Sequence, residues 1–137
     1  PNGASMLSSK CIKAPRGPED GRRISIMSRH TLDDGITPDQ GIAPESYDEW
    51  WKELAPDEKK LGLYLRGEIP FSSFVAGYRW RLFHEDATYE AINRLIDLAR
   101  NENVTVLCVE ASSARCHRRI LLEACSVMAP DLRISIL

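Results

Sequence analysis

One segment near the end of the chain is apolar at almost every position. Residues Val104–Val109 (VTVLCV) are also rich in β-branched side chains, which is typical of a strand buried on both faces at the centre of a parallel sheet. Alternating polar and apolar residues after Gly21 predict a second strand in the segment RISIMS. Shorter apolar stretches at the two ends of the chain predict two more strands. The predicted strands are therefore Leu7–Lys13, Arg23–Ser28, Val104–Val109 and Leu132–Leu137.

The pattern between residues 46 and 128 is mostly helical. Ser46 and Glu49 have the spacing of a capping box, and the apolar residues around them recur at i, i+3, i+4 and i+7, which predicts a helix. The same periodicity predicts four later helices. Pro56 favours the first turn of the next helix, and Gly67 favours its end. The remaining helices are expected at Phe71–Phe83, Thr88–Asn101 and Ser112–Met128.

These elements predict an α/β fold with a small, mostly parallel sheet flanked by helices and an inserted helical block from Ser46 to Phe83. The last two strands and the helix between them form a β-helix-β unit, the usual crossover between parallel strands. The length of 137 residues suits one domain, which we expect over residues 6–137. Residues Pro1–Ser5, before Met6, look like an expression-vector remnant and are left out of this prediction.

Composition excludes several classes of protein without naming an activity. The chain is 43% hydrophobic and 28% charged, and 18 Lys and Arg against 20 Asp and Glu give a net charge of −2. No run approaches the roughly 18 apolar residues of a membrane helix, and a near-neutral chain lacks the basic face of a general nucleic-acid coat. The four cysteines lack the C-x-x-C spacing of redox and zinc motifs, so we expect a cytoplasmic protein rather than a disulfide scaffold.

Polar residues follow two of the predicted strands, at the point where each strand ends. Ser28–Thr31 comes directly after one strand, and Glu110–Arg118 comes directly after VTVLCV and leads into a predicted helix N-terminus. Because open α/β sheets bind ligands at the carboxyl ends of their strands, and helix N-termini favour anions, we expect one composite site here. The candidate ligand-binding residues are Arg29, His30, Ser112 and Arg118, and the candidate catalytic residues are Glu110, Cys116 and His117.

Each candidate also has an ordinary structural interpretation. Ser112 can simply cap the helix, and His117 can be a hydrogen-bonded core residue. Arg118 can pair with Glu110. The two candidates that follow the predicted strand RISIMS can merely pin the long loop behind that strand. Cys116 is either a small buried hydrophobe or a nucleophile, because a helix N-terminus with His and Arg neighbours lowers the pKa of a thiol.

Two further chemistries receive less support from the sequence. Cys108, Cys116 and His117 could serve as metal ligands, but Cys108 lies in a buried strand and no second close pair completes a tetrahedral set. We therefore predict neither a metal nor another cofactor. The segment Tyr78–Arg81 interleaves aromatic and basic residues, as nucleic-acid binders do, but Tyr78 belongs to an inward helix face and the arginines suit a solvated surface.

The segment VTVLCVEASSARCHRRILLEAC resembles the C-terminal motif of the domain of unknown function 488 family: an apolar strand, an acidic residue, a short loop, Cys-His-Arg and a Leu-rich helix. The segments DGRRISIMSRHTLDDGITPD and YDEWWKELAP are also similar to that family, so the resemblance extends from Ile12 to the C-terminus. Many members carry Trp-Pro-Arg-Gly after the first clear strand, where this chain has Arg29-His30-Thr31-Leu32. The resemblance implies a small α/β domain of the prokaryotic cytoplasm, with Cys116-His117-Arg118 as its functional centre.

Three functions remain open at this point. The first is a binding domain or enzyme for a small anionic or phosphorylated molecule, such as a nucleotide, in which Arg118 and the helix N-terminus hold the anion. Glu110 or His117 would then act as acid or base, and Cys116 as nucleophile. The second is a non-catalytic module that binds protein or nucleic acid through the helical block and Tyr78–Arg81. The third is a thiol-based sensor that uses Cys116, for which the sequence shows no obvious partner cysteine.

Overall fold

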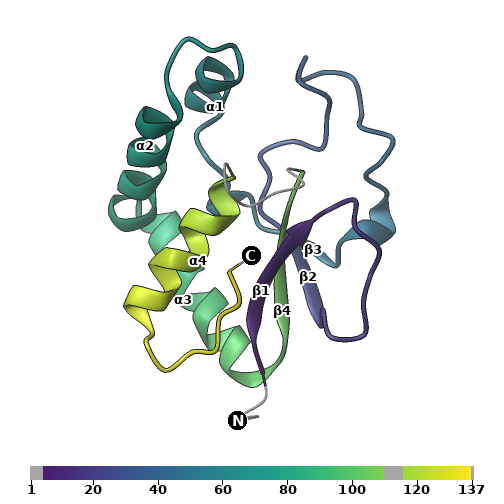
Figure 1. Ribbon diagram of the computed structural model, residues 1–137, viewed down its shortest axis with the longest axis vertical. Coiled ribbons are helices and arrows are strands. Elements are labelled where there is room, and N and C mark those ends of the chain that lie inside the picture. Colours follow the sequence, from purple (N-terminus) through teal and green to yellow (C-terminus); the bar gives the residue numbers. More distant parts are fainter. Residues whose placement is uncertain (1–4, 110–115, 137) are drawn as a thin grey trace.

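A four-stranded sheet forms the centre of the computed structural model, which describes residues 5–109 and 116–136 (Figure 1). The strands run in the order β1-β4-β2-β3, and each neighbouring pair is parallel. Their bounds are Leu7–Cys11 for β1, Arg22–Ser25 for β2, Glu49–Trp50 for β3 and Val104–Cys108 for β4. The predicted α/β class with a small parallel sheet is confirmed.

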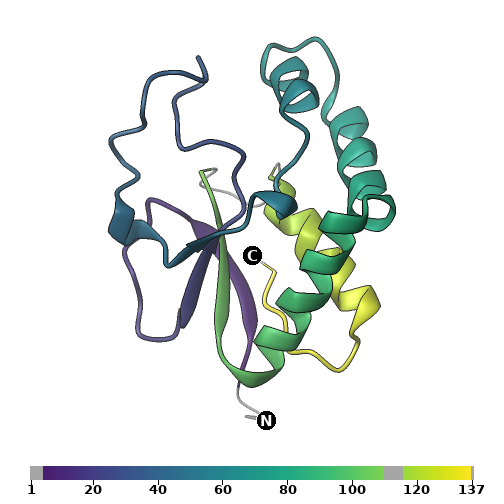
Figure 2. The same cartoon turned by 180° about the vertical axis from the view of Figure 1, so that it is seen from behind.

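The α-helices lie on one side of this sheet, and the loops that follow β1 and β2 lie on the other (Figure 1 and Figure 2). The helices are α1 (Glu58–Leu65), α2 (Phe71–His84), α3 (Asp86–Asn101) and α4 (His117–Met128), and two short 3-10 helices cover Pro44–Ser46 and Lys52–Leu54. Helix α2 packs against both α3 and α4. Within the described residues, none of the helices combines the length and apolar character needed to cross a bilayer.

Strand β4 has the central position, and all five of its residues are buried. Val104 and Val106 belong to the main apolar cluster, which includes residues of α2, α3 and α4. Leu107 and Cys108 join a smaller apolar cluster with Met27. A strand that is covered on both faces has no polar face to present, which explains its nearly continuous apolar sequence. The prediction of a doubly buried central strand is confirmed.

The helix predicted from the Ser46–Glu49 capping box is wrong. Glu49–Trp50 forms the edge strand β3, which pairs in parallel with β2. The Asp48 amide donates to the Arg23 carbonyl at 2.8 Å, and the Asp48 carboxylate accepts from the Arg23 amide at 2.8 Å. These long-range hydrogen bonds outweigh the local helical pattern of apolar residues, because tertiary contacts override a weak local preference.

The final strand predicted at Leu132–Leu137 is much shorter in the structure. Among the described residues it is a single parallel bridge between Leu7 and Ile134, beside β1. The Leu7 amide donates to the Arg133 carbonyl and the Ser135 amide donates to the Leu7 carbonyl, each at 2.9 Å. The chain end therefore extends the sheet by one pairing, which confirms its position but corrects its length.

The Arg23 side chain is only 1% exposed and joins three separate segments to β2. Its guanidinium donates to the Asp20 carboxylate at 2.7 Å. Its other contacts, at 2.9–3.3 Å, are with the backbone carbonyls of Ile12, Ala14 and Ser46. A buried charge is tolerated only when it is paired and hydrogen-bonded. Arg23 therefore anchors the β1–β2 loop and the segment before β3 to the sheet.

Replacing Arg23 by methionine should destabilise the domain strongly, because the change leaves three carbonyls without a donor and removes a cation from buried Asp20. We expect a loss of about 3–5 kcal/mol in the free energy of unfolding, measured by urea denaturation. The matched control Arg100→Met removes an exposed pair with Asp131, and should cost no more than about 1 kcal/mol. Equal losses in the two variants would contradict the anchoring role of Arg23.

Candidate functional site

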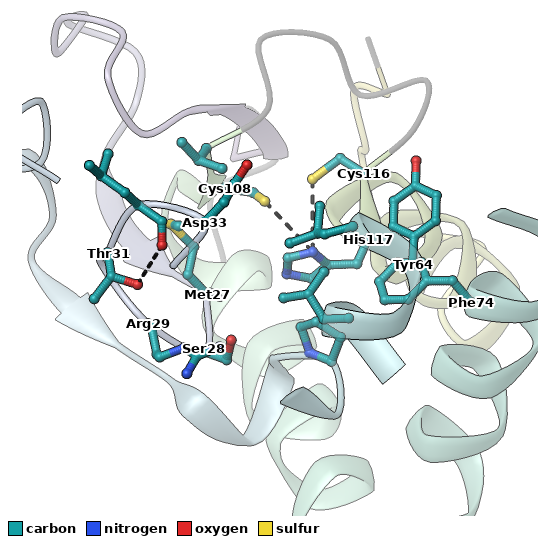
Figure 3. A pocket seen from close by; sticks show the side chains of 15 residues that line it. Met27, Ser28, Arg29, Thr31, Asp33, Tyr64, Phe74, Cys108, Cys116 and His117 are labelled. Atoms are coloured by element: carbon teal, nitrogen blue, oxygen red, sulfur yellow. Dashed lines mark hydrogen bonds between the residues drawn. The ribbon is translucent and has the colours of Figure 1, made fainter. Parts of the chain in front are cut away.

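A pocket opens where β2 and β4 end, between the segment that follows β2 and the helices α1 and α2 (Figure 3). The free space in this pocket and at its mouth, open solvent included, is about 710 Å³. The segment after β2 supplies a polar wall, α1 and α2 supply an apolar wall, and the ends of β4 and α4 form the floor.

The pocket brings together the two polar strand ends that the sequence singled out. Arg29 lines it from the segment after β2, and Cys116 and His117 line it from the start of α4. Because β2 and β4 are parallel neighbours, their carboxyl ends meet at the same edge of the sheet. The predicted proximity holds for Arg29, Cys116 and His117, whereas their functional roles stay predictions. The other two candidates from this region, Glu110 and Ser112, lie outside the described residues.

His30 and Arg118 are not among the described residues that line the pocket. The His30 ring stacks on Trp50 with centroids 3.8 Å apart, and its Nε2 lies 2.8 Å from Ser25 Oγ. Burial, and then the charge of Lys52, lowers the pKa of His30. Arg118 is 3% exposed and lies in the interior. Within the described chain, Arg29 is therefore the cation that reaches the pocket, and ligand binding by His30 or Arg118 stays a prediction.

His117 occupies the pocket floor with its ring held by hydrogen bonds on both sides. Its Nε2 lies 2.7 Å from the Ile26 carbonyl, which can only accept, so Nε2 carries the proton. Its Nδ1 is then an acceptor, 3.6 Å from Cys108 Sγ and 3.8 Å from Cys116 Sγ. The ring also meets the ring of Tyr78 edge-on, at a centroid distance of 5.3 Å. These contacts fix both the tautomer and the orientation of the imidazole.

Of the two interpretations of Cys116, the structure favours the small buried residue over a nucleophile with a lowered thiol pKa. Cys116 is 3% exposed, although it is the N-cap residue of α4. A hydrogen bond with the Cys108 thiol and burial both raise the pKa of Cys116, and they outweigh the opposing effect of His117. The thiol is therefore protonated at neutral pH, whereas the thiolate is the nucleophilic form.

Arg29 reaches the pocket on an exposed loop. Its Nη1 makes a long ion pair with Glu58 Oε2, at 3.6 Å, and both side chains are about half exposed. Gly35 lies beside the guanidinium: a Cβ at this position would be 2.7 Å from Nη1, and the backbone φ is 73°. Glycine adopts this φ without strain and leaves room for Arg29. The loop thus holds the guanidinium without enclosing it.

Tyr64 and Phe74 form an aromatic wall opposite Arg29. Their rings stack with centroids 5.2 Å apart and planes inclined by 18°. Leu61 and Leu65 of α1 complete this apolar wall. The helical periodicity of the sequence predicts that all four residues lie on covered helix faces. It does not indicate a role in the site, because periodicity marks a covered face without distinguishing a core from a pocket.

The burial of Cys116 predicts slow alkylation of its thiol in the native chain. Treated with iodoacetamide in the presence of a chelator and analysed by mass spectrometry, half-buried Cys11 should react first. Cys116 should react at least about tenfold more slowly than Cys11, because only a small fraction of the Cys116 thiol is ionised to the reactive thiolate. Cys125 is an internal control, since burial raises the pKa of its thiol to about 12. Alkylation of Cys116 at the rate of Cys11 would show that the thiol is accessible and ionised.

Comparison with protein families places the chain in a group of related sequences. Residues 7–127 match a family model described as the active DUF488-N3 subclade. The matched region includes all four strands, α1 to α3 and nearly all of α4. No curated protein and no solved structure gives a significant match. Because the family match covers most of the chain and includes the pocket floor, the protein belongs to the domain of unknown function 488 (DUF488) family.

Proposed function

We propose that the pocket binds a small anionic molecule, and that phosphorylated compounds such as nucleotides are the class it suits best. The observation that carries this proposal is that Arg29 and the start of α4 line the same cavity. A guanidinium and a helix N-terminus both attract negative charge. Two sources of positive potential therefore act on one enclosed space.

The helix contribution comes from the first turn of α4. This helix begins at His117 with Cys116 as its N-cap residue, and its first turn carries no acidic side chain. The amide groups and the dipole at such a helix start favour an anion. Arg29 can add a two-point contact with phosphate or carboxylate. Its exposed 3.6 Å pair with Glu58 is weak enough to be exchanged for a ligand.

The other walls of the pocket fit a ligand with both a sugar-like part and a ring. Ser28, Thr31 and Asp33 add hydroxyl and carboxylate groups to the polar wall. Tyr64 and Phe74 offer aromatic faces on the opposite wall, against which a planar ring can pack. A phosphate joined to a ring through a polar linker matches this distribution, and this is the general form of a nucleotide.

Ligand binding has more support than catalysis by the residues first considered. Cys116 is a protonated thiol, and both ring nitrogens of His117 already have partners. Catalytic or binding roles for Glu110 and Ser112 stay predictions, because these residues lie outside the described ranges. The matched subclade is described as active, and this description names neither a reaction nor a site.

A module that binds protein or nucleic acid through Tyr78–Arg81 has less support. Tyr78 is 2% exposed and belongs to the core. Arg79 pairs with Glu123 at 3.8 Å, and Arg81 donates to the Ala55 carbonyl at 2.8 Å. Both guanidiniums thus have partners within the protein, whereas a nucleic-acid surface needs cations directed at phosphates.

Thermal unfolding with and without ligands tests the proposal. Inorganic phosphate, ribose 5-phosphate and AMP, each well above its dissociation constant, should raise the melting temperature by several degrees, because a ligand that binds only the folded state stabilises it. Arg29→Ala should lose most of this rise. The control Arg100→Ala, at the opposite end of the sheet, should keep it. The proposal fails if none of the compounds raises the melting temperature, or if Arg29→Ala responds like the wild type.

A further inference from the structure

Three side chains with metal-binding atoms converge on the pocket floor. Cys108 comes from the end of β4, and Cys116 and His117 come from the start of α4 (Figure 3). The two sulfur atoms and one histidine nitrogen all lie within 4.8 Å of one another. All three residues are buried, and all three line the pocket. The fold thus assembles a thiol, thiol and imidazole set from two elements.

The spacing of these atoms fits tetrahedral coordination of one ion. Zinc bonds of about 2.3 Å to sulfur and about 2.0 Å to nitrogen place sulfur and nitrogen roughly 3.5 Å apart in a tetrahedral site. The measured separations from His117 Nδ1 are 3.6 Å to Cys108 Sγ and 3.8 Å to Cys116 Sγ. Both sulfur–nitrogen separations therefore lie within a few tenths of an ångström of the tetrahedral value.

The second nitrogen of His117 is arranged as in a metal site. A histidine that binds a metal through one nitrogen usually donates its other N–H to a carbonyl or carboxylate, which orients the ring and sets the tautomer. Here Nε2 donates to the Ile26 carbonyl at 2.7 Å. Nδ1 therefore directs its lone pair at the two sulfur atoms, and this orientation needs no change when a metal binds.

We propose that Cys108, Cys116 and His117 bind one zinc ion, with a fourth coordination position open to the pocket. Two S–H bonds break and two zinc–sulfur bonds form on binding, and the two protons pass to solvent. Two thiolates and an imidazole favour zinc among divalent ions, and three protein ligands with one open position are typical of a catalytic zinc site. Water fills the open position when the pocket is empty. An oxygen atom of the anionic ligand fills it when the ligand of the proposed function is bound. The metal site itself does not require that ligand.

Cobalt substitution tests this inference on the full chain. The reduced, metal-free protein is titrated with Co²⁺ in a buffer without phosphate. We expect one ion per chain, the intense visible absorption of four-coordinate cobalt, and a sulfur-to-cobalt charge-transfer band. One equivalent of Zn²⁺ should displace the cobalt and abolish the spectrum. Wild-type protein without a four-coordinate, sulfur-bound spectrum would overturn the inference, whether or not any variant folds.

Cysteine variants locate the site. Cys108→Ser and Cys116→Ser should each lose about half of the charge-transfer intensity and more than about 100-fold in affinity, since loss of a mere outer-shell partner costs about 10–100-fold. Cys125→Ser removes a buried thiol from α4, and Cys11→Ser removes a half-buried thiol from β1, so both variants should bind cobalt like the wild type. A spectrum that survives in Cys116→Ser, or disappears in Cys125→Ser, would place the metal elsewhere.

The cobalt titration and the melting experiment test the two proposals independently, so that one proposal can fail while the other stands. The cobalt titration contains no phosphate, and the melting experiment uses compounds that need no metal to contact Arg29. A normal cobalt spectrum without stabilisation by phosphates would leave the metal site standing and reject the anion ligand. A mass loss of about 2 Da, with Cys108 and Cys116 joined in a disulfide after purification under reducing conditions, would identify a redox pair and reject the metal site.

Discussion

The hydrogen bond from His117 Nε2 to the Ile26 carbonyl links the start of α4 to the segment directly after β2. It gives a buried carbonyl at the strand end a partner, and such groups are costly when they have none. It also sets the tautomer of the imidazole, so that Nδ1 faces the thiols of Cys108 and Cys116. The orientation of the imidazole on the pocket floor, and with it the convergence of the three metal-binding atoms, depends on this contact.

The two sides of the pocket differ in rigidity, and the difference suits their proposed roles. The metal-binding atoms lie on β4 and α4, and β4 is buried along its whole length. A site built on such elements keeps its geometry before a ligand arrives. Arg29 lies on an exposed loop with a weak partner in Glu58, so it can follow an anion into place. A fixed metal centre beside an adaptable cation is an arrangement that can hold a small anion at a Lewis acid.

Burial explains why much of the fold could be predicted from the sequence. It imposes a continuous apolar run on Val104–Val109 and a helical period on the later helices. The edge strand Glu49–Trp50 could not be predicted, because it depends on contacts between Asp48 and Arg23, 25 residues away in the chain. The proximity of two strand ends followed from parallel pairing. The sequence allows the three residues of the cluster as metal ligands but does not favour a metal, because the eight-residue spacing between Cys108 and Cys116 matches no metal motif. Only the positions of β4 and α4 in the fold bring the two sulfur atoms to one nitrogen.

The most direct test of the central claim, that a fixed His117 ring prepares the pocket floor for a metal, is long-range ¹H–¹⁵N NMR of its imidazole. Such spectra distinguish a protonated ring nitrogen from one that carries a lone pair. The metal-free protein should show a neutral ring with the proton on Nε2, and one equivalent of zinc should shift Nδ1 while Nε2 stays protonated. A metal-free ring with its proton on Nδ1, or an Nδ1 signal that zinc leaves unchanged, would contradict the claim.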